Sequence, residues 1–244
     1  TGRLLPTLRS NGPARVLIDG IADGVSAEVN ELFTEVEQSV AALEQRYSRY
    51  RDESLVSLIN RRAGSPQRTK IDTETIALLG LAEALWETTG GLFDITSGPL
   101  RRAWDFQSGA PARPELVEAA RDLIGWERLE WEGPYLRLPV QGMELDFGGI
   151  VKEYAVDCAD KSLRDAGVSS GIVDLAGDIG VIGNQADGSP WQIGIRDPFN
   201  EGSICTVNLT DAAIATSGNY ERRIAYQGED YGHLLDPETG WPVR

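Results

Sequence analysis

Apolar residues recur at helical spacing in several stretches of the chain. From Val29 to Tyr47 they hold one face for about five turns after Ser26, a predicted N-cap. A second stretch begins at the predicted N-cap Asp72 and continues to about Thr88. The predicted helices, two of them counted from the caps Ser26 and Asp72, are 26–47, 54–60, 72–88, 114–125 and 151–167.

Other stretches alternate between apolar and polar residues, or are short apolar runs between turns, which predicts strands. These are residues 14–19, 171–183 as two strands around a glycine bend, 191–198 and 204–210. Residues 126–147 are interpreted as a β-meander with a turn at Gly133-Pro134. The strands look antiparallel and no GxGxxG motif is present, so a dinucleotide-binding fold is disfavoured.

Composition describes a globular chain with an acidic surface. Its 244 residues, 41% of them hydrophobic, are enough for one large domain or two small ones with a real core. Lys and Arg number 23 against 38 Asp and Glu, and the net charge of −15 repels nucleic acid and anionic membranes. The chain begins at Thr1-Gly2 without a charged leader, so we expect that any targeting segment has been removed.

Several common catalytic and metal-binding motifs are missing from the sequence. HExxH, CxxC, EF-hand and GxSxG spacings are absent, which argues against those metal sites and against a Ser-His-Asp hydrolase. Cys158 and Cys205 are the only cysteines. Because Cys158 falls on the apolar face of its predicted helix, we interpret it as a small buried residue rather than as half of a disulfide or a zinc ligand.

The stretch from Glu144 to Asp160, ELDFGGIVKEYAVDCAD, predicts a strand, a glycine turn and the start of a helix. The first amides of a helix have no partners and lie at its positive end, so with two glycines before them they can receive an anion. Lys152 in the first turn is disfavoured by about 0.3–1 kcal/mol, and a bound anion would explain it. Asp146 can accept hydrogen bonds from a ring N–H or a hydroxyl. Alternatively, the glycines form only a tight connection and Lys152 is solvated.

His233 is the only histidine, and therefore the only imidazole that can serve as an acid or base near neutral pH. A lone histidine is more often structural, but Asp236 and Thr239-Gly240 follow it in a Pro-containing turn that can hold the ring near a phosphate. Residues 92–100 contain an acid, two hydroxyl side chains and a Gly-Pro turn within nine positions. Loops of this kind often carry functional residues. Tyr50 either lines a site or is an ordinary half-buried tyrosine.

Five separated blocks resemble, in their residues and in their order along the chain, the ApbE family of FAD:protein FMN transferases, or flavinyltransferases. They are SRYRDESLVSLIN (48–60), GGLFDITSGPL (90–100), LDFGGIVKEYAVD (145–157), DLAGDIGVIG (174–183), and ATSGNYERR with HLLDPETG (215–223 and 233–240). Any one block is a weak signal, but all of them in register across nearly the whole chain are specific.

The resemblance implies an α+β fold, with largely antiparallel sheets and packed helices, in a single domain over residues 1–244. It also implies that the chain binds FAD and, assisted by magnesium, transfers the FMN half onto a Thr hydroxyl of an acceptor flavoprotein, releasing AMP. It further implies that the carbonyl of Gly149 is a metal ligand and that His233 is the catalytic histidine of the HxxDPxTG motif. The FAD contacts that it implies are Tyr50, Leu92, Phe93, Asp94, Asp146, Lys152 and Leu235.

The chain departs from the family pattern at three places. Asn11-Gly12-Pro13 stands where the family has a Met-Gly-Thr-like strand that touches the flavin, and DLAGD replaces an NLGGD-type block. The family also continues past DPxTG into an Ala-Asp-Ala...Thr segment with further metal ligands, whereas this chain ends at Arg244. Since Mg²⁺ prefers about six oxygens, the Gly149 carbonyl alone should bind it poorly.

Two alternative functions therefore stay open. One is a flavin-binding protein that has lost catalysis, and the other is hydrolysis of FAD to FMN and AMP, with water replacing the Thr hydroxyl. By resemblance alone, we expect the protein in the periplasm or on the outer face of the cytoplasmic membrane, with a lipid anchor on a removed N-terminal segment as one option.

Overall fold

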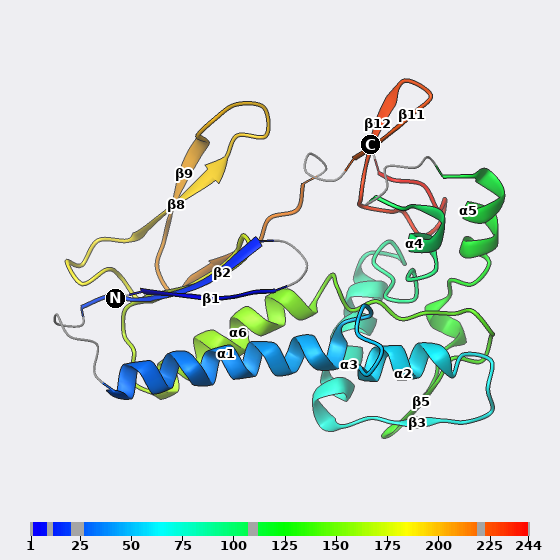
Figure 1. Cartoon of the computed structure of the whole chain (residues 1–244), viewed down its shortest axis with the longest axis horizontal. Coiled ribbons are helices and arrows are strands. Elements are labelled where there is room, and N and C mark those ends of the chain that lie inside the picture. The colour runs from blue at the N-terminus through cyan, green and yellow to red at the C-terminus, as the bar shows by residue number, and fades with distance from the viewer. Residues whose placement is uncertain (1, 9–11, 21–26, 107–111, 219–222, 244) are drawn as a thin grey trace. The chain divides into compact units, whose positions relative to one another are not determined.

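The computed structural model describes residues 2–8, 12–20, 27–106, 112–218 and 223–243 (Figure 1). Its contacts divide the chain into two compact units. Unit 1 comprises Thr1–Glu44 and Val151–Ser217, and unit 2 comprises Gln45–Ile150 and Gly218–Arg244. Each unit is therefore assembled from segments that are far apart in the sequence. That both belong to one family domain stays a prediction.

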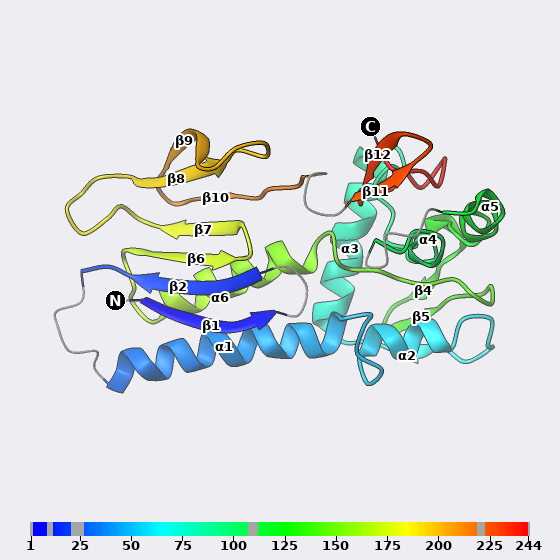
Figure 2. The ribbon, with the colours of Figure 1, turned by 45° about the horizontal axis from the view of Figure 1, so that its top comes forward.

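Unit 1 is built on an antiparallel sheet whose strands lie in the order β1-β2-β6-β7-β10 (Figure 2). Along β2, Ala14, Val16 and Ile18 are buried while Arg15 and Leu17 are exposed, the alternation expected of a sheet with one covered face. The strands are β1 (Gly2–Leu8), β2 (Gly12–Ile18), β6 (Gly171–Leu175), β7 (Asp178–Ile182) and β10 (Ala212–Ile214).

Two helices, α1 (Ala27–Tyr47) and α6 (Val151–Asp165), lie on the same face of this sheet (Figure 1). Each presents a stripe of residues three and four apart to the core, as an amphipathic helix does. The buried members that belong to unit 1 are Phe33, Val36, Val40 and Leu43 on α1, and Ala155, Val156, Ala159 and Leu163 on α6. A separate two-stranded ribbon of β8 (Trp191–Arg196) and β9 (Ser203–Leu209) completes the regular structure described in unit 1.

Unit 2 contains one long helix, several short helices and two small antiparallel sheets. One sheet has the order β3-β5-β4 and the other is the β11–β12 hairpin. The helices are α2 (Leu55–Arg61), α3 (Thr73–Thr88), α4 (Leu100–Ala103), α5 (Pro114–Arg121) and the 3-10 turn η1 (Trp126–Arg128). The strands are β3 (Thr69–Lys70), β4 (Glu130–Glu132), β5 (Tyr135–Arg137), β11 (Arg223–Tyr226) and β12 (Glu229–Gly232).

The predicted α+β fold is confirmed, and the predicted helices all form. The predicted strands at 14–19, 171–183, 191–198 and 204–210 form as well, within a few residues of the expected bounds. The predicted cap Asp72 accepts a hydrogen bond from the amide of Thr75, and Ser54 caps α2 by accepting one from the amide of Ser57. Asn11 and Ser26 lie outside the described residues, and no described helix is long and apolar enough to cross a membrane.

The strand predicted before Gly148-Gly149 is wrong. Of residues 144–147 only Glu144 makes a β-bridge, to Ser97. The amide of Asp146 donates to the Ile95 carbonyl at 2.8 Å, and the amide of Leu145 donates to the Asn60 side chain at 2.7 Å. A side chain of α2 and a loop carbonyl thus satisfy this backbone in place of a neighbouring strand.

The predicted β-meander over 126–147 is also wrong. Only the β4–β5 hairpin forms, around the predicted turn at Gly133, and the third strand of its sheet is β3 from earlier in the chain. Cys158 and Cys205 do not form a disulfide with each other in the described part of the chain. Cys158 is half-buried and Cys205 is exposed.

Replacing Asp72 with alanine is expected to lower the free energy of unfolding by about 1 kcal/mol, because the carboxylate caps α3 through Thr75. Asp72→Asn should retain most of the cap, since the amide oxygen still accepts that bond. Urea unfolding measures both, with Glu83→Ala on the exposed face of α3 as the control. Equal loss in Asp72→Ala and Glu83→Ala would contradict the cap.

Candidate functional site

Arg49 joins three segments of unit 2. Its Nη1 donates to the Gly98 carbonyl and to Asp146 Oδ2, both at 3.1 Å. Its Nη2 donates to Glu144 Oε2, also at 3.1 Å. These charge-assisted bonds fix the end of α1, the 92–100 loop and the segment before the glycine turn against one another. The sequence blocks around residues 50, 94 and 146 therefore meet in space.

Asp146 is held as a carboxylate. Arg101 Nε donates to its Oδ2 at 3.0 Å and the amide of Gly148 donates to its Oδ1 at 2.9 Å. Burial by itself would raise the pKa of Asp146, but the charges of Arg101 and Arg49 and the Gly148 amide outweigh it and lower that pKa. Asp146 thus stays ionised, with part of its hydrogen-bonding capacity already used by the protein.

This lowered pKa predicts how acid acts on the fold. The contribution of Asp146 to stability is fully present above the ordinary Asp pKa, near 3.9, and is lost as the pH falls through its lower folded pKa. Asp146→Asn is expected to lower the free energy of unfolding at neutral pH by about 1–3 kcal/mol and to remove this part of the acid sensitivity. Urea unfolding across the acid range measures it.

The control is Asp165→Asn. Asp165 pairs with Lys161 at the surface, where their side chains are 66% and 75% exposed, so its loss should change stability by less than about 0.5 kcal/mol. An Asp146→Asn variant as stable as this control, with unchanged acid sensitivity, would contradict the ionised role of Asp146.

Tyr50 and Leu92 present apolar surface to solvent, with exposed fractions of 65% and 57%. The guanidinium carbon of Arg49 lies 5.8 Å from the centre of the Tyr50 ring, a cation–π distance. Phe93 is half-buried, and a Cβ at position 149 would lie 2.9 Å from its Cε2, so Gly149 must be glycine for the ring to sit there. Exposed aromatic and aliphatic groups beside a charged network suit a ligand with a planar ring and a polar tail.

Asp94 has a structural task in the described loop. Its Oδ1 accepts from the amide and the hydroxyl of Thr96 at 2.7 and 2.6 Å, and its Oδ2 accepts from the amide of Trp126 at 3.3 Å. The residue is only 9% exposed. The predicted contact between Asp94 and FAD stays a prediction.

The segment after β12 carries His233 and Leu235, both half-buried. The Asp236 Oδ1 accepts from the amides of Glu238 and Thr239 at 2.8 and 3.3 Å. This closes the DPETG turn. Leu235 pairs with Pro242 across the turn and packs against a core cluster. That cluster consists of Leu100, Ala103, Trp104, Ala112, Val117, Ala120 and Ile224.

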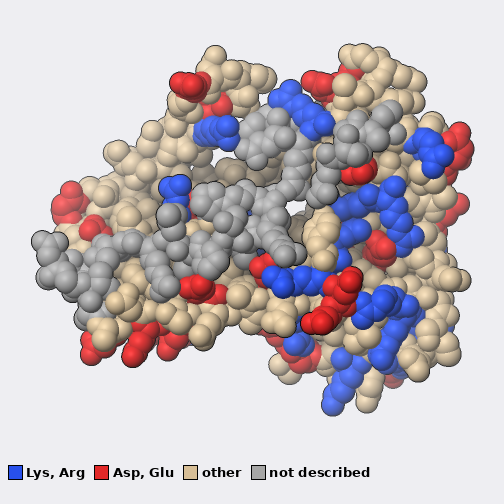
Figure 3. Space-filling view, viewed as in Figure 1, with Lys and Arg blue, Asp and Glu red and all other residues tan. Residues whose placement is uncertain are grey.

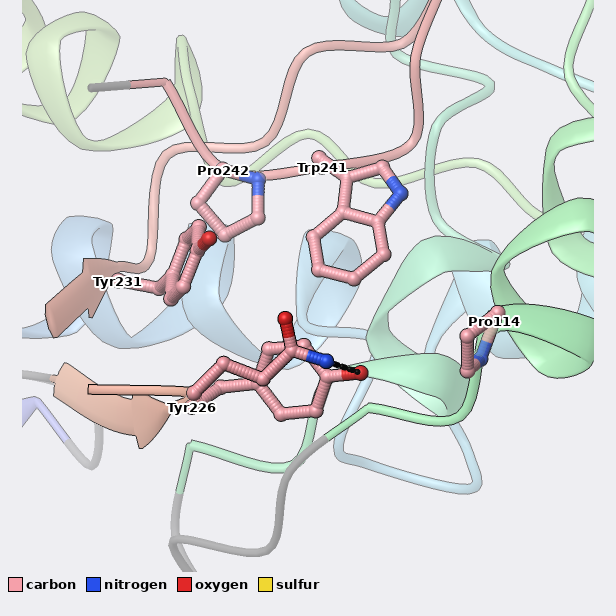
Figure 4. A pocket seen from close by; sticks show the side chains of 6 residues that line it. Pro114, Tyr226, Tyr231, Trp241 and Pro242 are labelled. Carbon is pink, nitrogen blue, oxygen red and sulfur yellow. Dashed lines mark hydrogen bonds between the residues drawn. The ribbon is translucent and has the colours of Figure 1, made fainter. Parts of the chain in front are cut away.

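A pocket of about 390 Å³ opens beside this segment (Figure 4). Its walls come from the β11–β12 hairpin, the start of α5 and the residues after the turn, and the Gln227 amide donates to the Tyr226 hydroxyl at 3.2 Å. Its volume lies within the range of small-molecule sites. The lining residues are Pro114, Tyr226, Gln227, Tyr231, Trp241 and Pro242.

Lys152 belongs to unit 1, and its ammonium lies 2.8 Å from Oδ2 of Asp178 on β7. The Lys152 side chain is 21% exposed and that of Asp178 is 3% exposed. Lys152 is therefore not a freely solvated surface lysine. It retains some exposed surface with which to meet an anion.

The described residues do not assemble a metal site. Among them, no group of three or more His, Cys, Asp and Glu side chains is arranged to hold a metal ion. The Gly149 carbonyl is the one ligand that the resemblance assigns within this chain, and that assignment stays a prediction.

Arg49, Arg101 and Glu144 are the residues of this network that the sequence did not point to. Arg49 lies beside Tyr50 in the first matching block, but its partners are about 50 and 95 positions away, so spacing alone does not pair them. Lys and Arg gather on the face of unit 2 seen in Figure 3, interspersed with acidic side chains, although the whole chain carries −15.

Comparison with known proteins gives a consistent result. The ApbE family model matches residues 15–244. A Vibrio cholerae protein named FAD:protein FMN transferase is 32% identical over 92% of this chain and 67% of its own length. One of that name from Treponema pallidum is 30% identical over 90% of this chain and 65% of its own. The chain thus spans about two thirds of the length of these relatives.

Solved structures agree with the sequence relatives. The ApbE protein of Thermotoga maritima matches with a TM-score of 0.87 and 28% identity, over all of this chain and 78% of that one. The flavinyl transferase ApbE of Pseudomonas stutzeri matches with a TM-score of 0.84 and 31% identity, over all of this chain and 76% of that one. The chain belongs to the ApbE family.

Proposed function

We propose that this chain is an FAD:protein FMN transferase, which moves FMN from FAD onto a Thr hydroxyl of an acceptor flavoprotein and releases AMP. The family membership supports flavin transfer in general. The observation that carries the proposal to this chain is the Arg49 network, which gathers Tyr50, the 92–100 loop and Asp146 around the glycine turn. The Thr acceptor and the AMP product are the finer part of the proposal.

The reaction breaks one bond and forms one. The Thr oxygen attacks the phosphorus that bears the riboflavin half, an O–P ester forms, and the bond from that phosphorus to the bridging oxygen breaks. AMP leaves with the bridging oxygen and the bond's electron pair. His233 takes the proton of the Thr hydroxyl as general base.

The other residues bind and orient the substrate. Tyr50, Leu92 and Phe93 offer the apolar surface for the flavin ring, and Asp146 accepts a hydrogen bond from a ring N–H or a hydroxyl. Leu235 completes the predicted contacts in unit 2, and Lys152 in unit 1 balances phosphate charge. Precise orientation matters here because most of the catalysis in phosphoryl transfer comes from positioning and charge stabilisation.

Magnesium is implied only by the resemblance. When bound, it would neutralise charge on the diphosphate and the leaving AMP. The described side chains do not make a site that fits it, so no step above passes through the metal. Repeating the assay after chelation, and again with added Mg²⁺, tests the requirement.

The test is a mass spectrum of a purified Thr-containing acceptor protein after incubation with this chain, FAD and Mg²⁺. We expect the acceptor to gain the mass of one FMN, and AMP to appear in equal amount. An acceptor with that Thr replaced by alanine is the matched control and should gain nothing. FMN and AMP in solution without labelled acceptor would instead indicate hydrolysis, and FAD binding without products would indicate a flavin-binding protein.

The location of the protein also stays a proposal. By resemblance we propose the periplasm or the outer face of the cytoplasmic membrane, and fractionation of cells that express the full-length gene tests it.

A further inference from the structure

Three arginines of unit 2 converge on two carboxylates. Arg49 contacts Glu144 and Asp146, Arg101 contacts Asp146, and Arg102 donates from its Nε to Glu144 Oε1 at 3.0 Å. The three guanidinium groups oppose two carboxylates, which leaves one net positive charge at this place in a chain of net charge −15. A local excess of positive charge attracts anions.

Arg101 differs from the other two arginines in what its guanidinium group still offers. Both Nη atoms of Arg49 donate to protein oxygens, and Arg102 donates from Nε and Nη2. Arg101 donates from Nε to Asp146 Oδ2 at 3.0 Å, and among the described residues neither of its Nη atoms has a hydrogen-bond acceptor. Its side chain is 33% exposed. A planar group that is fixed at one corner and keeps two further donors matches the paired oxygens of a phosphate.

The surroundings of Arg101 relate these donors to the proposed reaction. Leu100, the residue before it, is buried in the cluster against which Leu235 packs, and Leu235 lies two positions after His233. Arg101 itself bonds to Asp146, a proposed contact of FAD. The start of α4 therefore contacts both the proposed substrate-binding residues and the segment that carries the proposed base, all within unit 2. The phosphorus that is attacked must also lie within reach of both.

We propose that Arg101 binds, through its two Nη atoms, the phosphate of FAD that carries the riboflavin half. The Nε and Nη atoms belong to one small planar group, so this phosphate lies close to whatever Asp146 binds. In FAD the ribityl hydroxyls are next to this phosphate, whereas the ring N–H is at the far end of the flavin. Asp146 then accepts from a ribityl hydroxyl and not from the ring. This inference rests on the proposed function, in which the chain binds FAD.

The experiment measures the affinities of FAD, FMN and riboflavin for the whole chain by fluorescence titration. The three ligands share the flavin ring and the ribityl chain, and riboflavin lacks the phosphate. Arg101→Ala should weaken the binding of FAD and FMN by roughly tenfold or more, the effect of losing hydrogen bonds to a charged group. Riboflavin should bind the variant nearly as well as wild type, because Arg49 and the Gly148 amide still hold Asp146.

Arg101→Lys tests the contact through two nitrogens. Lysine keeps the positive charge but concentrates it in one ammonium group, which cannot reproduce the fixed fork of a guanidinium held at its Nε. The FAD affinity of this variant should therefore lie between the affinities of wild type and Arg101→Ala. Full FAD affinity in Arg101→Lys would overturn the contact through both Nη atoms.

Arg102→Ala is the matched control, because it removes the same charge from the same cluster. Arg102 already donates to Glu144 and to the Gly142 carbonyl, and its side chain is 50% exposed. Its loss should therefore weaken FAD binding by less than about fivefold. Equal losses in Arg101→Ala and Arg102→Ala would show that the cluster acts through its net charge, which would overturn the assignment to Arg101. Urea unfolding verifies that each variant is folded.

The outcomes separate this inference from the proposed function. Equal losses of riboflavin, FMN and FAD affinity in Arg101→Ala would mean that Arg101 acts only through Asp146, and would overturn the inference alone. A loss with FAD but not with FMN would assign Arg101 to the other phosphate and would overturn it as well. The expected pattern of affinities without FMN transfer to an acceptor overturns the transferase assignment alone. Absence of binding of all three flavins to wild type overturns both.

Discussion

Replacing His233 with alanine is expected to slow FMN transfer by roughly two to four orders of magnitude while leaving FAD bound. The only imidazole of the chain is the proposed general base, and the loss of such a group typically costs this much. FAD affinity should change little, because the proposed flavin contacts are made by other side chains, which this variant keeps. The rate is read as labelled acceptor over time, and the affinity by fluorescence.

Glu238→Ala is the matched control for this variant. Glu238 is exposed in the same turn, and its side chain has no role in the proposed step. It should therefore transfer FMN at nearly the wild-type rate. Full activity of His233→Ala would remove His233 as the base, and loss of FAD binding in that variant would show that the histidine binds substrate instead.

Replacing Trp104 with alanine is expected to lower the free energy of unfolding by about 3–5 kcal/mol. Trp104 is 1% exposed, and its indole N–H donates to the Gly240 carbonyl at 2.8 Å. Its ring centre lies 5.0 Å from that of Trp241 and 5.9 Å from that of Tyr231, on either side of the segment that carries His233. Urea unfolding measures the loss.

Two further variants, Trp104→Phe and Trp131→Ala, serve as comparisons for Trp104→Ala. The phenylalanine keeps most of the apolar contact but loses the bond to Gly240, so it should lie between wild type and Trp104→Ala. Trp131 is half-buried on β4 and donates to the nearby Gly133 carbonyl at 3.1 Å, so its removal should cost less. Equal losses for Trp104→Ala and Trp131→Ala would contradict the central place of Trp104 in the core.

Helices were predictable from the sequence because their signals are local. The periodic face of α1 and the cap at Asp72 lie within a few residues of the elements that they define. The β11–β12 hairpin was missed because each of its strands has only four residues and shows no sustained alternation of apolar and polar positions. Its signal was the turn, in which Gln227 and Gly228 have φ values of +52° and +84°, as a two-residue hairpin requires.

The candidate site was predictable only in part, for the opposite reason. The glycine turn and Lys152 could be found because they lie together at a helix start. The network of Arg49, Arg101 and Asp146 depends on segments that meet only in the folded chain, so no local sequence pattern predicts these contacts. For the same reason the residues before the turn were predicted as a strand, although their partners are the Asn60 side chain and a loop carbonyl.

The central strand of the unit 1 sheet bears on how the chain folds. β6 pairs with β2 on one side and with β7 on the other, and the pair Ala14 and Leu175 joins the beginning of the chain to its later part. During synthesis, β2 cannot pair with β6 until residues 45–150, which form most of unit 2, have been made. Such distant pairing slows folding, so we expect residues 45–150 to acquire structure first and the β2–β6 ladder to form in the slow phase.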